Sequence, residues 1–264
     1  MMDRSAARKK TLCVTFDNLG EAAEIEFGLL PPDTPAGDHV SANVMPRILD
    51  ILSSNGVQAT FFFEGWNAGT YPKVLESVVE GGHELALHGW RHENWADVAA
   101  EREKELLDRS FKAFRDLGLN PVGFRPPGGG ITQQTVELLA EQGATHISPA
   151  AHIELPTNTL ANIPFAWSDV DAFWFEPLMA PLREAVLGGG KGAVGPLSVW
   201  ADNLAKHLNP AAQQDEVKTL IFHPYMLALD EDRMQLFEQF IADLARQGDV
   251  ATARCADIAA LQHA

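Results

Sequence analysis

Polar side chains that can do chemistry follow five short apolar runs of this sequence. The runs TLCVTF, ATFFF, HELAL, VGF and TLIF are each followed at once by an ionisable or metal-binding residue. In chain order these residues are Asp17 with Asn18, Glu64, His88, Arg125 and His223. Carboxylates and imidazoles are the groups that proteins use most for proton transfer and for holding divalent metals.

The positions of these residues predict a common site. If the apolar runs are strands of one parallel sheet or barrel, their carboxyl ends lie on one face, where such folds carry their active sites. Polar residues also begin ordinary loops, so a single position of this kind says little. Five residues of these types at one rim favour a site.

Two histidines, His88 and His92, are separated by four residues. This spacing brings two imidazoles to one metal ion if the chain is helical or tightly turned. Gly89 argues against a helix interior, and no Glu directly follows His88, so the helical zinc-protease motif HExxH is absent. The alternative is two unrelated surface histidines. Asp17-Asn18 and His223 at other strand ends make a shared ligand set the preferred interpretation.

The elements that must position these residues alternate along the chain. Short apolar runs alternate with stretches of helical period, a pattern typical of βα units. Strands are predicted at residues 11–16, 58–63, 83–87, 121–124, 145–148, 218–222 and 250–254. Two helical stripes are predicted to face the core, one with Met45, Ile48, Leu49 and Leu52 and one with Phe237, Phe240, Ile241 and Leu244.

Two irregular segments interrupt this alternation. Residues 19–41 contain a proline-rich stretch and are predicted to form an inserted loop or lid after the first strand. Residues 187–195 are glycine-rich but are not a phosphate loop, because no Ser or Thr follows Lys191, and a surface loop is predicted. No internal repeat or shift in composition marks a boundary, so residues 1–264 are expected to form a single domain.

Composition narrows the function classes. The chain has 264 residues, 46% of them hydrophobic, with 36 acidic against 20 basic residues and a net charge of -16. Such a charge repels phosphate backbones and anionic lipids, so nucleic acid and membrane partners are not expected. Residues 1–10 lack the apolar stretch of a secretory signal, which predicts a cytoplasmic protein. Cys13 and Cys255 have no CxxC spacing and are predicted to be reduced, buried thiols.

Taken in order, these residues resemble the motifs of the polysaccharide deacetylase family, the NodB-homology hydrolases of carbohydrate esterase type. The resemblance runs from about residue 11 to residue 227. Four of its motifs are TFDN at 15–18, where the family has TFDD, ATFFF at 59–63, HGWRH at 88–92, and FRPPG at 124–128, where the family has RxPxG. The family's fourth motif is weak here, and Asp171 is its best candidate. The last motif is LIFHP at 220–224. Each motif is short and common, but all of them in order are specific.

The resemblance implies an α/β fold, an irregular (β/α) barrel of about seven strands that is a distorted TIM barrel, and a divalent metal, usually zinc. It also implies the site roles: Asp17 as general base, Arg125 orienting its carboxylate, His88 and His92 as metal ligands, His223 as general acid, and Asp171 as a further catalytic residue. Substrate contacts are expected from Glu64, Trp90, Pro127 and Gly128.

Asn18 departs from the family pattern, which has a metal-binding Asp at this position. A neutral amide oxygen is a weaker zinc ligand than a carboxylate. Three possibilities follow: Asn18 still binds the metal through its oxygen, Asp17 binds it instead, or the protein works without metal. A bound metal with Asn18 among its ligands is preferred.

The segment HGWRHE and the late His-Pro are similar to the branch of the family that includes intracellular peptidoglycan-deacetylase-like proteins, cyclic imide hydrolases and allantoinase-like proteins. The predicted reaction is N-deacetylation of an amino sugar or a related small amide. The alternatives are opening of a small cyclic amide or imide, a barrel that binds a ligand without turnover, and a purely structural role. Assembly into a homo-oligomer is also possible. Aromatic residues that either line the pocket or pack in the core are Trp66, Trp90, Trp95 and Phe175.

Overall fold

In the computed structural model, residues 10–154, 159–209 and 217–262 are described. Within them, eight strands form one parallel sheet. The strands are β1 (Lys10–Asp17), β2 (Thr60–Phe63), β3 (Glu84–Leu87), β4 (Gly123–Phe124), β5 (His146–Ile147), β6 (Ala161–Asn162), β7 (Val217–Phe222) and β8 (Val250–Thr252).

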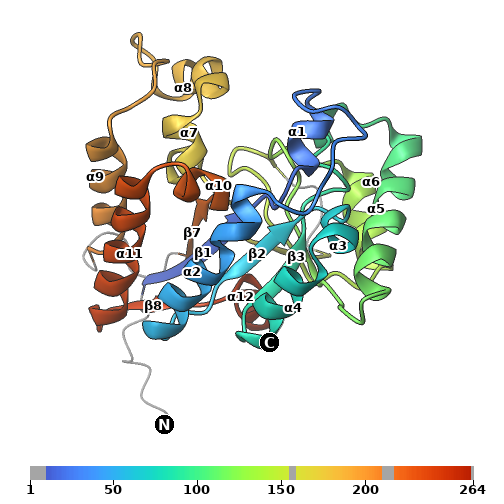
Figure 1. Cartoon of the computed structure of the whole chain (residues 1–264), viewed down its shortest axis with the longest axis horizontal. Coiled ribbons are helices and arrows are strands. Elements are labelled where there is room, and N and C mark those ends of the chain that lie inside the picture. The colour runs from blue at the N-terminus through green and yellow to red at the C-terminus, as the bar shows by residue number, and fades with distance from the viewer. Residues whose placement is uncertain (1–9, 155–158, 210–216, 263–264) are drawn as a thin grey trace.

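The sheet curls into a distorted barrel, as predicted (Figure 1). Seven strands follow one another in the order β6-β5-β4-β3-β2-β1-β7, and β8 pairs with the first residues of β1. Between the two outer strands, a single isolated bridge joins Val170, which lies after β6, to Ile221 of β7. This bridge is what brings the segment after β6 next to β7.

Helices surround the sheet (Figure 1). The helices that precede β5 along the chain are α1 (Ala22–Glu26), α2 (Val40–Ser54), α3 (Asn67–Thr70), α4 (Pro72–Glu80), α5 (Ala100–Arg115) and α6 (Gln133–Glu141). The remaining helices are α7 (Asp171–Phe175), α8 (Ala180–Leu187), α9 (Leu197–His207), α10 (Pro224–Ala228), α11 (Glu231–Arg246) and α12 (Cys255–Gln262). Three short 3-10 turns are η1 (Trp95–Asp97), η2 (Trp167–Asp169) and η3 (Pro177–Met179).

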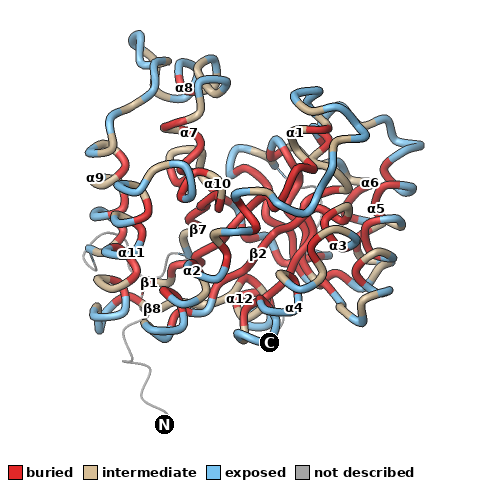
Figure 2. Tube along the Cα trace, in the orientation of Figure 1, coloured by how far each residue is buried: buried red, intermediate tan, exposed pale blue. Residues whose placement is uncertain are grey.

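Side chains alternate along the strands between two buried regions, the core between the sheet and the helices and the inside of the barrel. In β1, Leu12, Val14 and Phe16 belong to the large core between sheet and helices, whereas Cys13 belongs to a second cluster. Successive strand residues point to opposite faces, so Thr15 and Asp17 share the side of Cys13, the inside of the barrel. The outer core contains the predicted stripes of α2 and α11, and Phe16 stacks on Phe61 with centroids 4.6 Å apart. Figure 2 shows the buried strands at the centre of the molecule.

Two expectations about the elements need correction. The short strand β6 was not predicted, because two residues carry no readable period and it pairs only with β5. The predicted loop at residues 19–41 contains the helix α1, and its last two residues already belong to α2. Ala22 and Ile25, two residues of α1, are buried, and this apolar packing stabilises the short helix.

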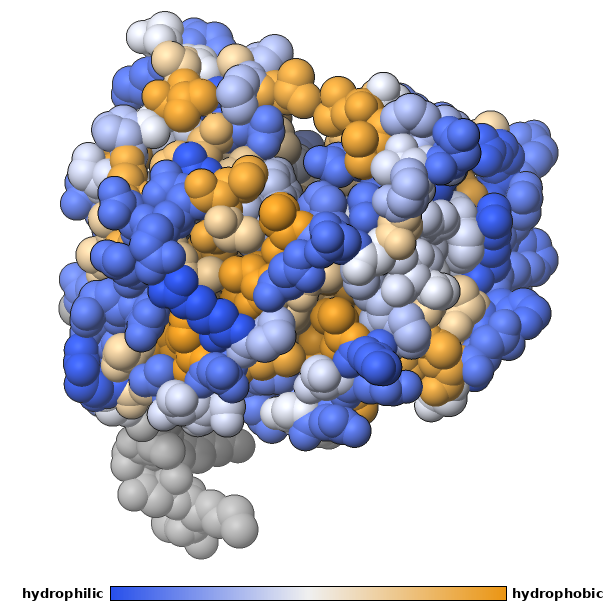
Figure 3. Space-filling view, in the orientation of Figure 1, coloured by the Kyte–Doolittle hydropathy of each residue, from blue (hydrophilic) through white to orange (hydrophobic). Residues whose placement is uncertain are grey.

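The surface is hollowed at the top of the view in Figure 3, between the part that carries α8 and the part that carries α1. Phe27, at the end of α1, is 53% exposed and packs edge-on against the ring of His92, with centroids 5.2 Å apart. A salt bridge of 3.0 Å joins Glu26 to Arg91. The segment after β1 therefore packs against the loop after β3.

Cys13 and Cys255 are free, buried thiols, as predicted. Among the described helices, none combines the length and the apolar character that crossing a membrane requires.

Candidate active site

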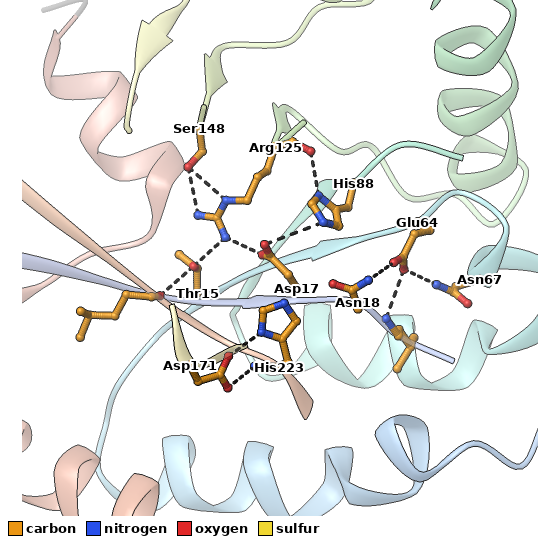
Figure 4. A network of polar contacts seen from close by, with 12 residues as sticks. Thr15, Asp17, Asn18, Glu64, Asn67, His88, Arg125, Ser148, Asp171 and His223 are labelled. Atoms are coloured by element: carbon orange, nitrogen blue, oxygen red, sulfur yellow. Dashed lines mark hydrogen bonds and ion pairs between the residues drawn. The ribbon is translucent and has the colours of Figure 1, made fainter. Parts of the chain in front are cut away.

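Asp17, the last residue of β1, lies at the centre of the site and pairs with Arg125, which directly follows β4 (Figure 4). Oδ1 of Asp17 accepts a hydrogen bond from a terminal nitrogen of Arg125 at 2.5 Å, and both side chains are buried. A buried carboxylate needs such a partner, because an unpaired charge in the interior is costly. The other carboxylate oxygen, Oδ2, lies 3.9 Å from Nε2 of His88. One oxygen is thus held by the guanidinium and the other faces an imidazole.

Arg125 is itself fixed from several sides. The nitrogen that binds Asp17 also donates to Oγ1 of Thr15 at 2.9 Å. Nε and the second terminal nitrogen donate to Oγ of Ser148 at 3.2 and 3.0 Å. The guanidinium lies 4.0 Å from the centroid of the Phe62 ring, a cation–π contact. Because all of these groups hold the planar guanidinium, Arg125 is a rigid donor that sets the direction of the Asp17 carboxylate.

His88, directly after β3, is a buried and uncharged imidazole. Its Nδ1 lies 2.8 Å from the backbone carbonyl oxygen of Arg125, so Nδ1 carries the proton and donates it. The lone pair is then on Nε2, as in metal-binding histidines whose other nitrogen hydrogen-bonds a carbonyl. Burial lowers the pKa of His88 to about 3, and the nearby Arg125 and His223 charges act in the same direction.

Asn18 and His92 share an unusual backbone conformation. Among the described residues, they are the two non-glycine residues with positive φ, at 65° and 76°. This left-handed conformation costs free energy for residues with a side chain, and such residues gather at functional sites. Two of the three predicted metal ligands are therefore held in strained backbone.

The same two side chains each present an unpartnered buried atom. Oδ1 of Asn18 and Nδ1 of His92 are buried without a hydrogen-bond partner. The rings of His88 and His92 lie edge to face with centroids 4.8 Å apart. Burial lowers the pKa of His92 well below its usual value, so this imidazole is also uncharged. A divalent metal held by Asn18, His88 and His92 would engage both orphan atoms, so these residues fit the predicted ion.

Glu64 lies behind Asn18 and is completely buried. Its Oε1 accepts from Nδ2 of Asn18 at 2.9 Å, and its Oε2 accepts from the Leu19 amide at 3.2 Å and from Asn67 at 2.6 Å. Burial raises the pKa of Glu64 to about 8. Because Nδ2 of Asn18 points to Glu64, the amide oxygen is the atom left free. These contacts support a positioning role for Glu64, and its substrate contact stays a prediction.

On the opposite side of Asp17, His223 pairs with Asp171 (Figure 4). Nδ1 of His223 donates to Oδ1 of Asp171 at 2.5 Å, and the backbone amide of His223 donates to Oδ2 at 2.8 Å. Burial opposes a charge on His223, but the Asp171 carboxylate outweighs it and raises the pKa of the imidazole. The Val170–Ile221 bridge brings Asp171 here, since it joins the residue before Asp171 to a residue two before His223. The weak fourth motif thus contributes a buried partner of the late histidine.

The predicted substrate-contact residues lie around this group in different environments. Trp90 is half-buried beneath the guanidinium of Arg109, 3.9 Å from the ring centroid. Pro127 is buried and Gly128 is exposed. Gly128 has a φ of 77°, and a Cβ at this position would collide with Oδ1 of Asn94, so only glycine fits this turn. Contact of these residues with a substrate stays a prediction.

Of the four aromatic residues considered for the pocket wall, two belong to the core. Trp95 is fully buried, donates to Oγ1 of Thr135 at 2.9 Å and packs against Phe124. Phe175 is also buried, beneath the guanidinium of Arg233. Trp66 is half-buried, like Trp90.

Two residues of the site were not identified from the sequence. Thr15 precedes Asp17 by two positions, so its side chain lies on the same face of β1. The alternation of side chains along a strand could therefore have identified it. Ser148 follows β5, so the rule applied to the other strand ends also points to it. Both hold Arg125.

Comparison with known proteins identifies the family of the chain. The profile of the family described as "Polysaccharide deacetylase" matches residues 4–147, more than half of the chain. The peptidoglycan deacetylase of Helicobacter pylori is 28% identical over 155 residues, which cover 56% of this chain and 53% of that protein. The chain thus spans about half the length of this curated relative, and only 34% of the peptidoglycan deacetylase-like protein FGM2 of Gibberella zeae.

Solved structures share the fold over nearly the whole chain. A protein from Mycobacterium smegmatis that is assigned to the polysaccharide deacetylases superposes with a TM-score of 0.78 at 24% identity, covering 98% of this chain and 92% of that chain. The PuuE allantoinase superposes with a TM-score of 0.70 at 18% identity, with the same coverage of both chains. At these identities the likeness shows the fold.

Proposed function

The chain belongs to the polysaccharide deacetylase family, and from this premise we propose that it hydrolyses a carbon–nitrogen amide bond, with an N-acetylated amino sugar as the substrate class. The observation that carries the proposal is the pair of buried dyads on one rim, Asp17 with Arg125 and Asp171 with His223. One dyad pairs a carboxylate with a guanidinium, and in the other a carboxylate raises the pKa of an imidazole. Amide hydrolysis needs this combination of a base and an acid.

Asp17 acts as the base in the proposed reaction. Arg125 occupies its Oδ1, so Oδ2 is the oxygen that accepts a proton from the attacking water. As that proton leaves, the water oxygen bonds to the amide carbon. The rigid contacts of Arg125 to Thr15 and Ser148 keep the carboxylate in one orientation, which lowers the entropic cost of the step.

His223 acts as the acid. Its Nδ1 proton is committed to Asp171, so Nε2 carries the proton that is available for transfer. The raised pKa favours the protonated ring. When the carbon–nitrogen bond breaks, the departing nitrogen takes the proton from Nε2 and leaves as an amine. Asp17 and His223 thus exchange protons in opposite directions, and the water is divided between the acid and amine products.

Asn18, His88 and His92 would hold the divalent metal of this site, through the amide oxygen and two uncharged imidazoles. When bound there, zinc or a similar cation polarises the substrate carbonyl and lowers the pKa of a water towards about 7. Glu64 supports this set, because its hydrogen bond from Nδ2 of Asn18 keeps the amide oxygen turned away from it.

A small cyclic amide or imide is the second candidate substrate, and the segment after β1 favours it. Phe27 packs on His92, and Glu26 pairs with Arg91, so this segment lies against the proposed metal ligands. Such a cover restricts the space for a polymer more than for a small ring. The fold shared with the PuuE allantoinase is consistent with this candidate.

Two assays with the purified chain, supplied with zinc or cobalt, test the proposed function. Release of primary amine from N-acetylated glucosamine oligomers would support deacetylation, and ring opening of hydantoins or succinimides would support the second candidate. A chain that binds these compounds but turns over none of them would contradict hydrolysis and favour a non-catalytic barrel.

Replacing Asp171 with asparagine should shift the pH profile of this activity. The Asp171 carboxylate raises the pKa of His223, so its loss lowers that pKa. Because the acid must be protonated, activity falls as pH rises through the His223 pKa, and in the variant this fall begins at lower pH. The measurement is kcat against pH.

A matched control exists in the same region. Asp169 forms a buried pair with His207 at 2.9 Å, outside the proposed site. Asp169→Asn should leave the alkaline limb of the profile where it is in the unmodified chain. An alkaline limb that does not move in Asp171→Asn would contradict the role of His223 as the acid.

A further inference from the structure

A second polar cluster lies inside the barrel, at the end opposite the proposed active site. Glu84 is the first residue of β3, His146 the first residue of β5, and Cys255 the first residue of α12 after β8. His88 follows β3 four residues after Glu84, so about 13 Å of extended strand separates the two groups. The cluster therefore belongs to a different site from the rim.

The three side chains converge. The potential metal-ligand atoms of Glu84, His146 and Cys255 all lie within 4.8 Å of one another. Among the His, Cys, Asp and Glu residues of the described chain, these three form the group that meets this limit. His146 and Cys255 are completely buried, and Glu84 is 7% exposed. Asp17, His88 and His92 do not form so tight a group.

The two atoms that face each other in this cluster form a buried ion pair. Oε1 of Glu84 and Nε2 of His146 lie 3.1 Å apart, and neither makes a hydrogen bond to any other group. The outer atoms of both side chains are fixed: Oε2 of Glu84 accepts from Thr60 and from the Ala256 amide, each at 2.8 Å. Nδ1 of His146 lies 3.2 Å from Oγ1 of Thr145. These contacts direct the two paired atoms into the cluster.

This geometry is that of ligands around one ion. Two ligand atoms that bind a tetrahedral zinc at about 2.0–2.1 Å are about 3.3 Å apart, close to the observed separation. Imidazole, carboxylate and thiolate are all zinc ligands, and a thiolate favours zinc over magnesium or calcium. Cys13 lies in the same apolar cluster as Cys255 but is not one of the three converging residues.

The barrel also leaves room for the imidazole. A Cβ on Gly123 of β4 would collide with the ring of His146, so a glycine is needed for this histidine to point into the barrel. Around the cluster, Phe62, Ala86 and Ile258 are buried and exclude water.

We propose that Glu84, His146 and Cys255 bind a structural zinc ion that fastens α12 to the amino-terminal end of the barrel. The ion would join β3, β5 and α12, elements far apart in the sequence. Its ligands are closed off from solvent, so the ion would contribute to stability rather than to the reaction.

Cobalt substitution tests this proposal on the full chain, because the rim residues include no cysteine. Cobalt bound to a thiolate gives a near-ultraviolet charge-transfer band, which ligands such as Asn18, His88 and His92 do not produce. After removal of metal with a chelator, cobalt should produce this band in the unmodified chain. His146→Ala should weaken the cobalt affinity read from the band by about tenfold or more, since even outer-shell changes cost 10–100-fold.

The matched control is His88→Ala, a change to a proposed rim ligand, which should leave the band unaltered. If metal removal unfolds the chain, native mass spectrometry of untreated protein supplies the second measurement: one zinc should remain in a His88→Ala, His92→Ala double variant. Absence of the thiolate band in cobalt-loaded protein, a Cys13–Cys255 disulfide, or a metal-free double variant would each overturn the proposal.

Discussion

Replacement of Asp17 by asparagine should lower kcat by about 10²–10⁴-fold, the usual contribution of a positioned general base. Asparagine has the same shape and can still accept a hydrogen bond from Arg125, so the geometry of the site is largely kept. It cannot take the proton of the attacking water. The measurement is kcat under saturating substrate, with the metal supplied in excess.

Asp50→Asn is the control for this variant, because Asp50 lies on the exposed face of α2 and contacts no residue of the site named above. It should retain the activity of the unmodified chain. If Asp17→Asn also retained that activity, Asp17 would not be the base, and the proposed mechanism would fail at its first step.

Replacement of Arg125 by methionine should reduce the free energy of unfolding by about 3–5 kcal/mol, the cost of removing one partner of a buried ion pair. The variant leaves the buried Asp17 carboxylate without its charge partner and removes the donors to Thr15 and Ser148. The cation–π contact with Phe62 is lost as well. Urea denaturation followed by circular dichroism measures the change.

Arg115 provides the exposed counterpart. It donates two hydrogen bonds to Gln142 and lies over the Phe111 ring, but its side chain faces solvent. Arg115→Met should therefore cost no more than about 1 kcal/mol. A double variant with Asp17→Asn should lose less stability than the sum of the single variants, because both act on one interaction. Equal losses for Arg125→Met and Arg115→Met would contradict the importance assigned to burial.

The sequence predicted the strands with long apolar runs well, because alternation and burial leave a pattern there. β1 and β7 have such runs, and their last or next residues, Asp17 and His223, lie at one rim as expected. β6 has two residues and no pattern of its own. Its position depends on pairing with β5, a contact that no local signal encodes.

The predicted directions of side chains were correct where the position of the residue along a strand determines which way its side chain points. They were incomplete where packing against distant parts of the chain determines that direction. Trp95 resembled a pocket residue in the sequence but is enclosed by α6 and β4, where its indole nitrogen finds Thr135. Ser148 lay at a predicted strand end, yet its role depends on the reach of Arg125. The grouping of Glu84, His146 and Cys255 spans 171 positions and follows only from closure of the sheet.

The single bridge between Val170 and Ile221 has a consequence for local unfolding. It is the one pairing described between the two outer sides of the sheet, and Asp171 is its immediate neighbour. Regions held by few pairings open before the rest of a protein does. Opening here separates Asp171 from His223 while the other strands stay paired. We therefore expect heating to disrupt the Asp171–His223 pair together with this part of the barrel wall.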